Sequence, residues 1–208
     1  MTSNIPRHPF TTIVVLGVPG VGKTTVLNNL VRLASEKNIK VVIKNMGDYM
    51  LKEALRREFV KSRDEIRYLK IRQQLELQLL AVKSIVQDAY HELREDGVLI
   101  VDTHAVIKTK YGYWTGIPKP LVEELRPDAF IIIEADVNEI LSRQLRDKSR
   151  YRSDFARAEV ISELMELTRR NAFAAALFTS SLVKVVMNKE GKAEEAAKEI
   201  LEVIEGLR

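Results

Sequence analysis

The stretch GVPGVGKTT (residues 17–25) follows the apolar run TTIVVL (residues 11–16) and leads into a segment with helical periodicity. Four of its residues match the pattern G-x-x-x-x-G-K-[ST]: Gly17, Gly22, Lys23 and Thr24. Glycines let the backbone turn tightly and direct several N–H groups inward, where they and the helix N-terminus hold a phosphate. The Lys23 ammonium would neutralise the β- and γ-phosphates of a nucleoside triphosphate, and the Thr24 hydroxyl is a candidate Mg²⁺ ligand. The alternative, a glycine-rich turn with an incidental lysine, is disfavoured by the strand-to-helix setting.

The rest of the chain alternates between two patterns. Five apolar runs rich in Val or Ile are predicted strands, at 11–17, 40–46, 97–104, 129–136 and 182–188. Strands that are buried on both faces of a parallel sheet have this composition. Helical periodicity fills the intervals, at 24–37, 62–95, 138–148, 158–178 and 193–206. The alternation predicts a three-layer α/β P-loop NTPase fold, in which helices flank a mostly parallel five-stranded sheet.

Local features refine this prediction. Ser62 and Glu65 have the spacing of a capping box at the start of the long helix predicted over 62–95. The stretches 105–120 and 147–156 are predicted to be irregular, and irregular segments on a rigid scaffold are common ligand-binding sites. Because no repeat, linker or change of composition divides residues 1–208, we expect a single domain.

Composition narrows the class of protein. The chain has 208 residues, 46% of them hydrophobic and 30% charged, and its formal net charge is +4. It contains no cysteine, which excludes disulfides and cysteine-based metal sites. No apolar run is long enough for a signal peptide or a membrane span, so we expect a cytoplasmic protein without a membrane partner.

Acidic residues end two of the predicted strands. Asp102 closes the run VLIVD and is the candidate to hold Mg²⁺ opposite Thr24, although an aspartate also commonly ends a strand in α/β proteins. Glu134 and Asp136 end the run IIIEAD. Because a predicted helix begins directly after them, we expect these two to be helix caps or solvated groups.

A cluster of arginines favours an enzyme that transfers a phosphoryl group over a GTPase that acts only as a switch. Arg143, Arg146, Arg150 and Arg152 lie within the sequence SRQLRDKSRYRSD. A transferring phosphoryl group spreads negative charge over its oxygens, which planar guanidinium groups neutralise through bidentate contacts. A short arginine-rich lid would supply this charge only when closed, and would exclude water from the site. The alternative is a solvated basic helix face.

The acceptor of the phosphoryl group is expected to bind between residues 47 and 80. Asp48 could cap a helix or orient the acceptor, and Arg63 and Arg67 could hold an acceptor phosphate. Gln74 and Gln78 lie four residues apart on the predicted long helix, so they share one of its faces. Their amides both donate and accept hydrogen bonds, which suits the edge of a nucleotide base.

These stretches together resemble an archaeal-type adenylate kinase. The resemblance spans residues 13–191 and is carried by GVPGVGKTT, NMGDYM, SRDEIR, VDTHAVIKT, GYWTGIP, IEADVNEILSRQLRDKSRYRSD and VVMNKEG. It implies transfer of the γ-phosphate of ATP to AMP, with Mg²⁺, to give two ADP. It also implies that ATP contacts the whole glycine-rich loop, which adds Val18, Pro19, Gly20, Val21 and Thr25 to the residues above.

The resemblance carries further expectations. Asn188 would lie by the adenine of ATP, His104 would lie near the site, and residues 143–156 would form the short lid. The sheet order would be 2-3-1-4-5, and the protein would be a homotrimer. A lid zinc is excluded, because the lid has no cysteine.

Two other functions share the glycine-rich loop. The first is a kinase for another nucleoside monophosphate or a small metabolite. The second is an ATP-hydrolysing factor in RNA or ribosome assembly, which would bind RNA through basic residues with a steep salt dependence. The chain has no arginine–glycine repeat or aromatic stacking motif, so we expect no nucleic-acid partner.

Overall fold

The computed structural model describes residues 7–94, 96–109, 112–146 and 157–208. Its main sheet contains β1 (Thr11–Leu16), β2 (Val41–Asn45), β3 (Val98–Asp102), β6 (Ala129–Glu134) and β7 (Leu182–Met187). All neighbouring pairs are parallel, and the order is β2-β3-β1-β6-β7. The predicted five-stranded sheet is confirmed, and so is the order 2-3-1-4-5 when only the strands of this sheet are counted.

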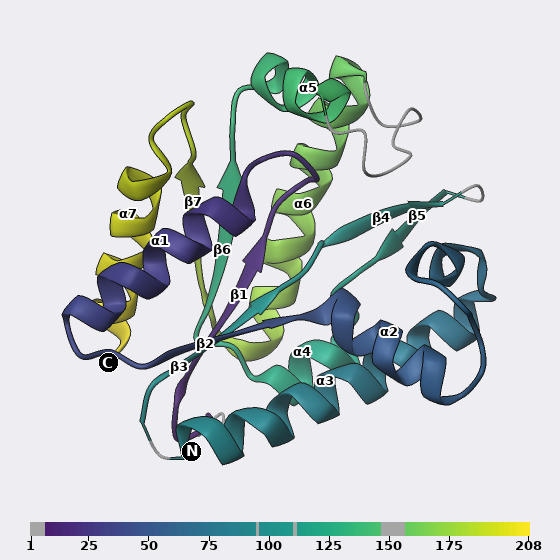
Figure 1. Cartoon of the computed structure of the whole chain (residues 1–208), viewed down its shortest axis with the longest axis horizontal. Coiled ribbons are helices and arrows are strands. Elements are labelled where there is room, and N and C mark those ends of the chain that lie inside the picture. The colour runs from purple at the N-terminus through teal and green to yellow at the C-terminus, as the bar shows by residue number, and fades with distance from the viewer. Residues whose placement is uncertain (1–6, 95, 110–111, 147–156) are drawn as a thin grey trace.

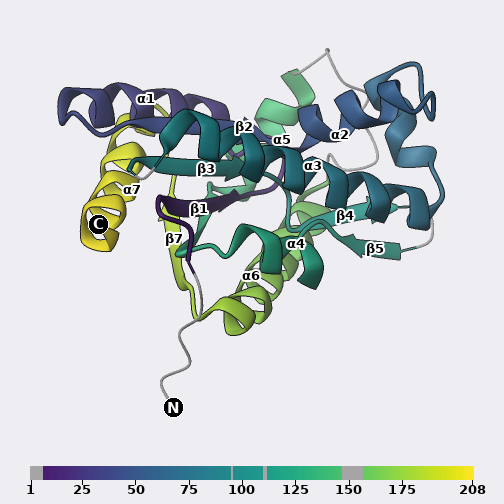
Figure 2. The same cartoon turned by 90° about the horizontal axis from the view of Figure 1, so that it is seen from below.

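Helices cover both faces of the sheet (Figures 1 and 2). One face carries α1 (Lys23–Glu36) and α7 (Ala193–Leu207), and the other carries α3 (Ile71–Leu93), α4 (Lys119–Leu125) and the C-terminal half of α6 (Ala158–Thr179). The central strand serves both layers, because Ile13 and Val15 pack into one core cluster and Val14 and Leu16 into the other. This accounts for the nearly continuous apolar runs of the inner strands β1, β3 and β6, since period-two alternation appears only when one face meets water.

The carboxyl ends of the strands form the edge at which the loops gather. Asn45 at the end of β2 pairs in register with Asp102 at the end of β3, and Val15 of β1 pairs with the same Asp102. Residues 17–22 leave β1 at this edge and enter α1. Helix α5 (Val137–Arg146) follows β6 there, and α2 (Met46–Arg56) follows β2.

The predicted helix over 62–95 is wrong as a single element. A 3-10 helix, η1 (Arg63–Tyr68), comes first, and α3 begins at Ile71. The Gln73 side chain accepts a hydrogen bond from the Lys70 N–H at 3.2 Å, and Gln74 Nε2 donates to the Leu69 carbonyl at 2.9 Å. The two glutamines therefore satisfy backbone groups at the break, and Ser62 and Glu65 belong to the short helix before it.

The predicted irregular stretch 105–120 is also wrong. It contains an antiparallel hairpin of β4 (Val106–Thr109) and β5 (Gly112–Thr115), followed by the start of α4. Figure 1 shows the hairpin projecting from the carboxyl edge of the sheet towards α2. The other irregular stretch, 147–156, lies outside the described residues.

The two carboxylates after β6 have different surroundings. Asp136 caps α5, because its Oδ1 accepts from the N–H groups of Asn138 and Glu139, as predicted. Glu134 is neither a cap nor solvated. Its side chain is 2% exposed and forms a bidentate ion pair with Arg169 of α6, with Arg169 Nε 2.6 Å from Glu134 Oε1. Among the described helices, none combines the length and the apolar composition that crossing a membrane requires.

Candidate active site

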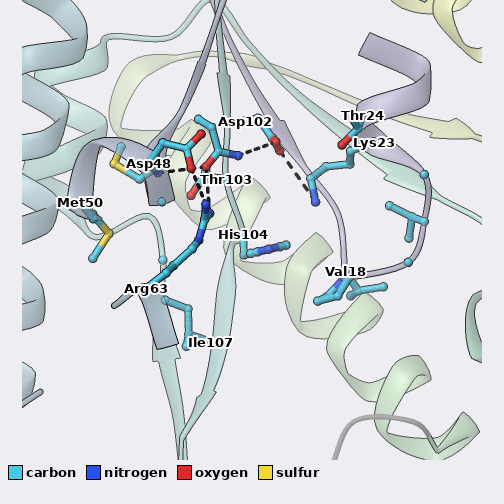
Figure 3. A pocket seen from close by; sticks show the side chains of 18 of the residues that line it. Val18, Lys23, Thr24, Asp48, Met50, Arg63, Asp102, Thr103, His104 and Ile107 are labelled. Atoms are coloured by element: carbon cyan, nitrogen blue, oxygen red, sulfur yellow. Dashed lines mark hydrogen bonds and ion pairs between the residues drawn. The ribbon is translucent and has the colours of Figure 1, made fainter. Parts of the chain in front are cut away.

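A cavity of about 610 Å³ opens at the carboxyl edge of the sheet (Figure 3). One wall is the glycine-rich loop and the start of α1, from Val18 to Thr25. The opposite wall is the start of α2 with Arg63 of η1 and Gln78 of α3. Asp102, which ends β3, lies between the two walls. The cavity therefore joins the predicted triphosphate site to the predicted acceptor site.

Lys23 of the loop and side chains from other elements hold the loop's carbonyl groups. Gly17 O accepts from Lys23 Nζ at 3.0 Å and lies 2.8 Å from His104 Nδ1. Because a carbonyl can only accept, the Nδ1 of His104 carries the proton in this contact. Pro19 O accepts from Gln144 Nε2 of α5 at 2.6 Å. These contacts hold the backbone of the loop in place, and its N–H groups would bind a phosphate.

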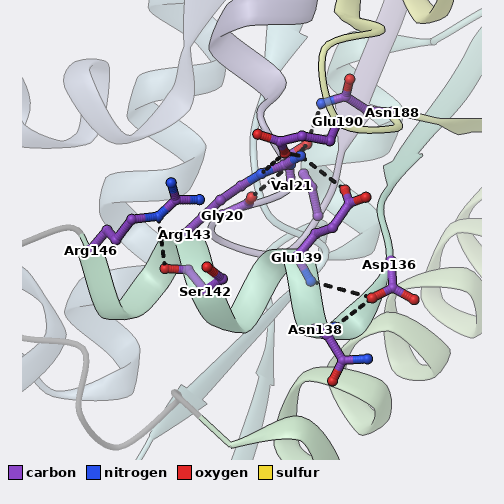
Figure 4. A network of polar contacts seen from close by, with 10 residues as sticks. All are labelled: Gly20, Val21, Asp136, Asn138, Glu139, Ser142, Arg143, Arg146, Asn188 and Glu190. Carbon is purple, nitrogen blue, oxygen red and sulfur yellow. Dashed lines mark hydrogen bonds and ion pairs between the residues drawn. The ribbon is translucent and has the colours of Figure 1, made fainter.

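A residue that follows the edge strand β7 holds the second half of the loop (Figure 4). Asn188, which follows β7, donates from Nδ2 to Val21 O at 2.7 Å. A Cβ on Gly22, whose φ is +87°, would come within 2.5 Å of that nitrogen. Position 22 therefore needs glycine for its backbone conformation and for the close approach of Asn188. Asn188 is 4% exposed and supports the loop through this contact. Its predicted contact with adenine stays a prediction.

The residues predicted to hold Mg²⁺ come together in the cavity. Asp102 Oδ2 accepts from Asn45 Nδ2 at 2.8 Å, whereas its buried Oδ1 has no hydrogen-bond partner among the described residues. The Lys23 ammonium lies 3.8 Å from this Oδ1. Asp102 and Thr24 line the same cavity, and a carboxylate and a hydroxyl fit a hard cation that prefers oxygen ligands and retains water.

The wall formed by the start of α2, Arg63 and Gln78, where the acceptor is predicted to bind, is a network of charged and amide groups. Asn45 Oδ1 caps α2 by accepting from the Asp48 N–H at 3.2 Å. The cap is thus Asn45, and the Asp48 carboxylate is instead paired with Arg63. Gln78 is 1% exposed, and its Oε1 has no partner among the described residues although it borders the cavity. Gln74 lies away from the cavity, with its amide bound to the backbone of Leu69.

The predicted arginines fall into separate places. Arg143 borders the cavity, where its Nη1 lies 3.4 Å from the carbonyls of Gly20 and Val21. It also pairs with Glu139 at 3.0 Å and with Glu190, whose pKa the guanidinium holds below its usual range. Arg146 points away and bonds the Ser142 carbonyl at 3.3 Å (Figure 4).

Three predicted residues cannot be placed. Arg150, Arg152 and the Arg67 side chain lie outside the described residues. Sequence reasoning also missed two supporting residues, Asn45 and Gln144. Asn45 had a usable cue, because it directly precedes a helix and asparagine is a favoured N-cap. Gln144 had none, because it acts on a loop more than a hundred residues away in the chain.

The parallel sheet and its glycine-rich loop define a P-loop nucleotide-binding protein. Consistent with that class, residues 16–162 match the model of the AAA domain family. The chain is 47% identical over 188 residues to the adenylate kinase of Saccharolobus solfataricus, covering 90% of this chain and 96% of that one. It is 40% identical to the adenylate kinases of Pyrococcus furiosus (93% and 94% covered) and Methanopyrus kandleri (94% and 98% covered). The chain belongs to the adenylate kinase family.

Proposed function

We propose that this protein catalyses reversible transfer of the γ-phosphate of ATP to AMP, giving two ADP. One observation carries the proposal. A single cavity joins a phosphate-binding loop bearing Lys23 to a second wall bearing the guanidinium of Arg63. Two phosphate sites that face each other across one cavity suit direct transfer between two nucleotides, because the attacking and leaving oxygens must lie in line.

The donor nucleotide would bind along the loop from Gly17 to Thr25. The N–H groups of the loop and the N-terminus of α1 would hold the phosphates of the nucleotide. The Lys23 ammonium would leave the Gly17 carbonyl and contact the β- and γ-phosphates. Thr24 and Asp102 would hold Mg²⁺, which neutralises charge on the transferring group. Asn188 would lie by the adenine, as the family resemblance implies.

The acceptor nucleotide would bind against α2, η1 and α3. Arg63 would hold its phosphate, and an oxygen of that phosphate would attack the γ-phosphorus while the bond to the ADP oxygen breaks. Gln78 lines the cavity and has a buried acceptor oxygen without a partner among the described residues, and an oxygen of this kind suits the amino edge of adenine. A base without that amino group would leave the oxygen unpaired, which costs far more than a missing methylene.

Arginines would complete the site around the moving group. Arg143 is already at the loop, held by Glu139 and Glu190. Arg146, Arg150 and Arg152, in the proposed lid over 143–156, would close over the transferring phosphoryl group. Closure would exclude water and so favour transfer over hydrolysis.

The test is consumption of Mg·ATP by the purified protein with AMP, UMP, CMP, or water alone as acceptor. We expect AMP to give by far the highest kcat/KM, and water to give almost no turnover. A comparable kcat/KM with UMP or CMP would identify a kinase of broader specificity. ATP hydrolysis without any acceptor would favour the RNA-assembly alternative.

The quaternary state and the cellular location complete the proposal. We infer a homotrimer from the family resemblance and a cytoplasmic location from the sequence. Light scattering coupled to size-exclusion chromatography measures the first, and a species of one or two chains would contradict it.

A further inference from the structure

Asn45 links Asp102, which lies between the two walls of the cavity, to Arg63 on the wall of α2 and η1, through the two ends of one amide. Its Nδ2 donates to Asp102 Oδ2 at 2.8 Å, and its Oδ1 accepts from Arg63 Nη2 at 3.3 Å and from the Asp48 N–H at 3.2 Å. The orientation of the amide is fixed by its neighbours. A carboxylate only accepts, and a guanidinium and a backbone N–H only donate. A flipped amide would break all three contacts.

The backbone around Asn45 is held firmly. Asn45 is the last residue of β2 and pairs in register with Asp102 of β3, so the two side chains leave one sheet edge side by side. It is also the N-cap of α2, the helix that forms the acceptor wall. A residue on rigid elements fixes its contacts more closely than one on a loop. A continuous series of side-chain contacts, Lys23–Asp102–Asn45–Arg63, thus runs from one wall of the cavity to the other.

We propose that Asn45 is a positioning residue that holds the donor-side Asp102 and the acceptor-side Arg63 at a fixed separation for in-line transfer. The proposal rests on the proposed function, because it assigns the two walls to ATP and AMP. Asn45 orients the Asp102 carboxylate so that its other oxygen remains directed at the donor site, and it anchors one edge of the Arg63 guanidinium. Substituting outer residues that orient a metal-binding carboxylate typically lowers activity by about 10- to 100-fold.

The competing explanation is that Asn45 only caps α2. The variant Asn45→Ser separates the two roles, because a serine Oγ still accepts from the Asp48 N–H and is as good a cap. The shorter side chain cannot also reach Asp102 and Arg63. Asn171→Ser is the matched control. Asn171 is a half-buried amide on α6 that donates to the Leu167 carbonyl at 2.9 Å, outside the cavity.

For Asn45→Ser we expect a melting temperature within about 2 °C of the parent, because the cap is retained. We expect kcat to fall by about tenfold or more. The control should keep the parental kcat, whatever its effect on the melting temperature. A parental kcat in Asn45→Ser would overturn the proposal.

Two binding measurements by calorimetry need no turnover. The first is AMP binding without ATP or divalent ions, for the parent, Asn45→Ser, Arg63→Ala and the double variant. We expect Asn45→Ser to weaken AMP binding by about threefold or more in the parent, and to have no further effect in Arg63→Ala, because coupled residues are not additive. The second is the gain in ATP affinity on adding Mg²⁺, which we expect to shrink in Asn45→Ser.

The outcomes separate this proposal from the proposed function. If the parent binds AMP and Asn45→Ser binds it equally well, or if the two substitutions are additive, the positioning role is wrong and the function stands. An unchanged Mg²⁺ effect on ATP affinity would also overturn the positioning role. If the parent neither binds AMP nor phosphorylates it, the proposed function itself is wrong.

Discussion

Gly47→Ala should make the protein more stable and a poorer enzyme. Gly47 lies in the first turn of α2, and its φ lies outside the positive range, so alanine fits the backbone. Alanine is favoured over glycine in a helix by about 0.5–1 kcal/mol. For a chain of this size, that corresponds to a rise in melting temperature of about 1–4 °C.

The substitution also displaces the guanidinium group of Arg63. A Cβ at position 47 would lie 2.4 Å from Arg63 Nη2 and 3.2 Å from Asn45 Oδ1, whereas ordinary contact begins at 3.4 Å. The guanidinium must therefore retreat by about 1 Å, which is cheap for folding because it is the end of a flexible side chain. A hydrogen bond to a charged group contributes about 1.5–3 kcal/mol. Because the Arg63 side chain is 41% exposed, we take the lower end, which is about a tenfold rise in the KM for AMP.

The assay is ADP formation at saturating Mg·ATP with varied AMP, alongside thermal unfolding. Gly206→Ala is the matched control, because Gly206 lies in α7 and a Cβ there would meet nothing within 4 Å. The control should gain stability without a change in KM. If Gly47→Ala keeps the parental KM for AMP while it gains stability, Arg63 does not hold the acceptor phosphate where we place it.

Three further predictions concern single side chains. Lys23→Met should leave the fold intact and remove most phosphoryl transfer, because it deletes the charge at the migrating group; near-normal turnover in steady-state kinetics would contradict the phosphate site. Arg169→Ala should lower the free energy of unfolding by about 2–3 kcal/mol, below the usual cost of breaking a buried pair, because Arg169 is half exposed while Glu134 is buried; denaturation in urea measures it, and a loss under 1 kcal/mol would contradict the buried-charge argument. Arg150→Lys and Arg152→Lys should each lower kcat with a smaller effect on ATP affinity, since lysine lacks the bidentate geometry, and an unchanged kcat in both would place the lid elsewhere.

The sheet was predictable because burial on both faces leaves a strong mark on composition. Each of the five strands is rich in Val, Ile or Leu, although β2 and β7 each contain one lysine, and the glycine pattern identifies β1 as the strand that leads into the phosphate-binding loop. The break before Ile71 was not predictable in the same way. A 3-10 helix of six residues and an α-helix have similar periods over so short a segment, so the apolar spacing continues through the break.

Pairings between distant residues were the harder part of the site. The sequence places Glu134 at the end of a strand. Its partner Arg169 lies 35 positions away on α6, and the sequence does not show where that helix packs against the sheet. Gln74 and Gln78 share a helix, and the sequence predicts one role for both, yet Gln74 serves the start of α3 and, of the two, Gln78 borders the cavity. Spacing identifies which residues share a face, and docking decides which of those groups remains available to a ligand.

The support of the glycine-rich loop has a consequence for its motion. Its carbonyls are held by His104 after β3, Gln144 of α5 and Asn188 after β7, which are far apart in the chain. Surface loops normally open by themselves, at a small fraction of the global unfolding free energy. Here, the loop can open only when its hydrogen bonds to three separate parts of the domain break together. The loop should therefore keep its conformation before any nucleotide binds, and the N–H groups of residues 18–22 should become protected from exchange with solvent deuterium only when a phosphate binds them.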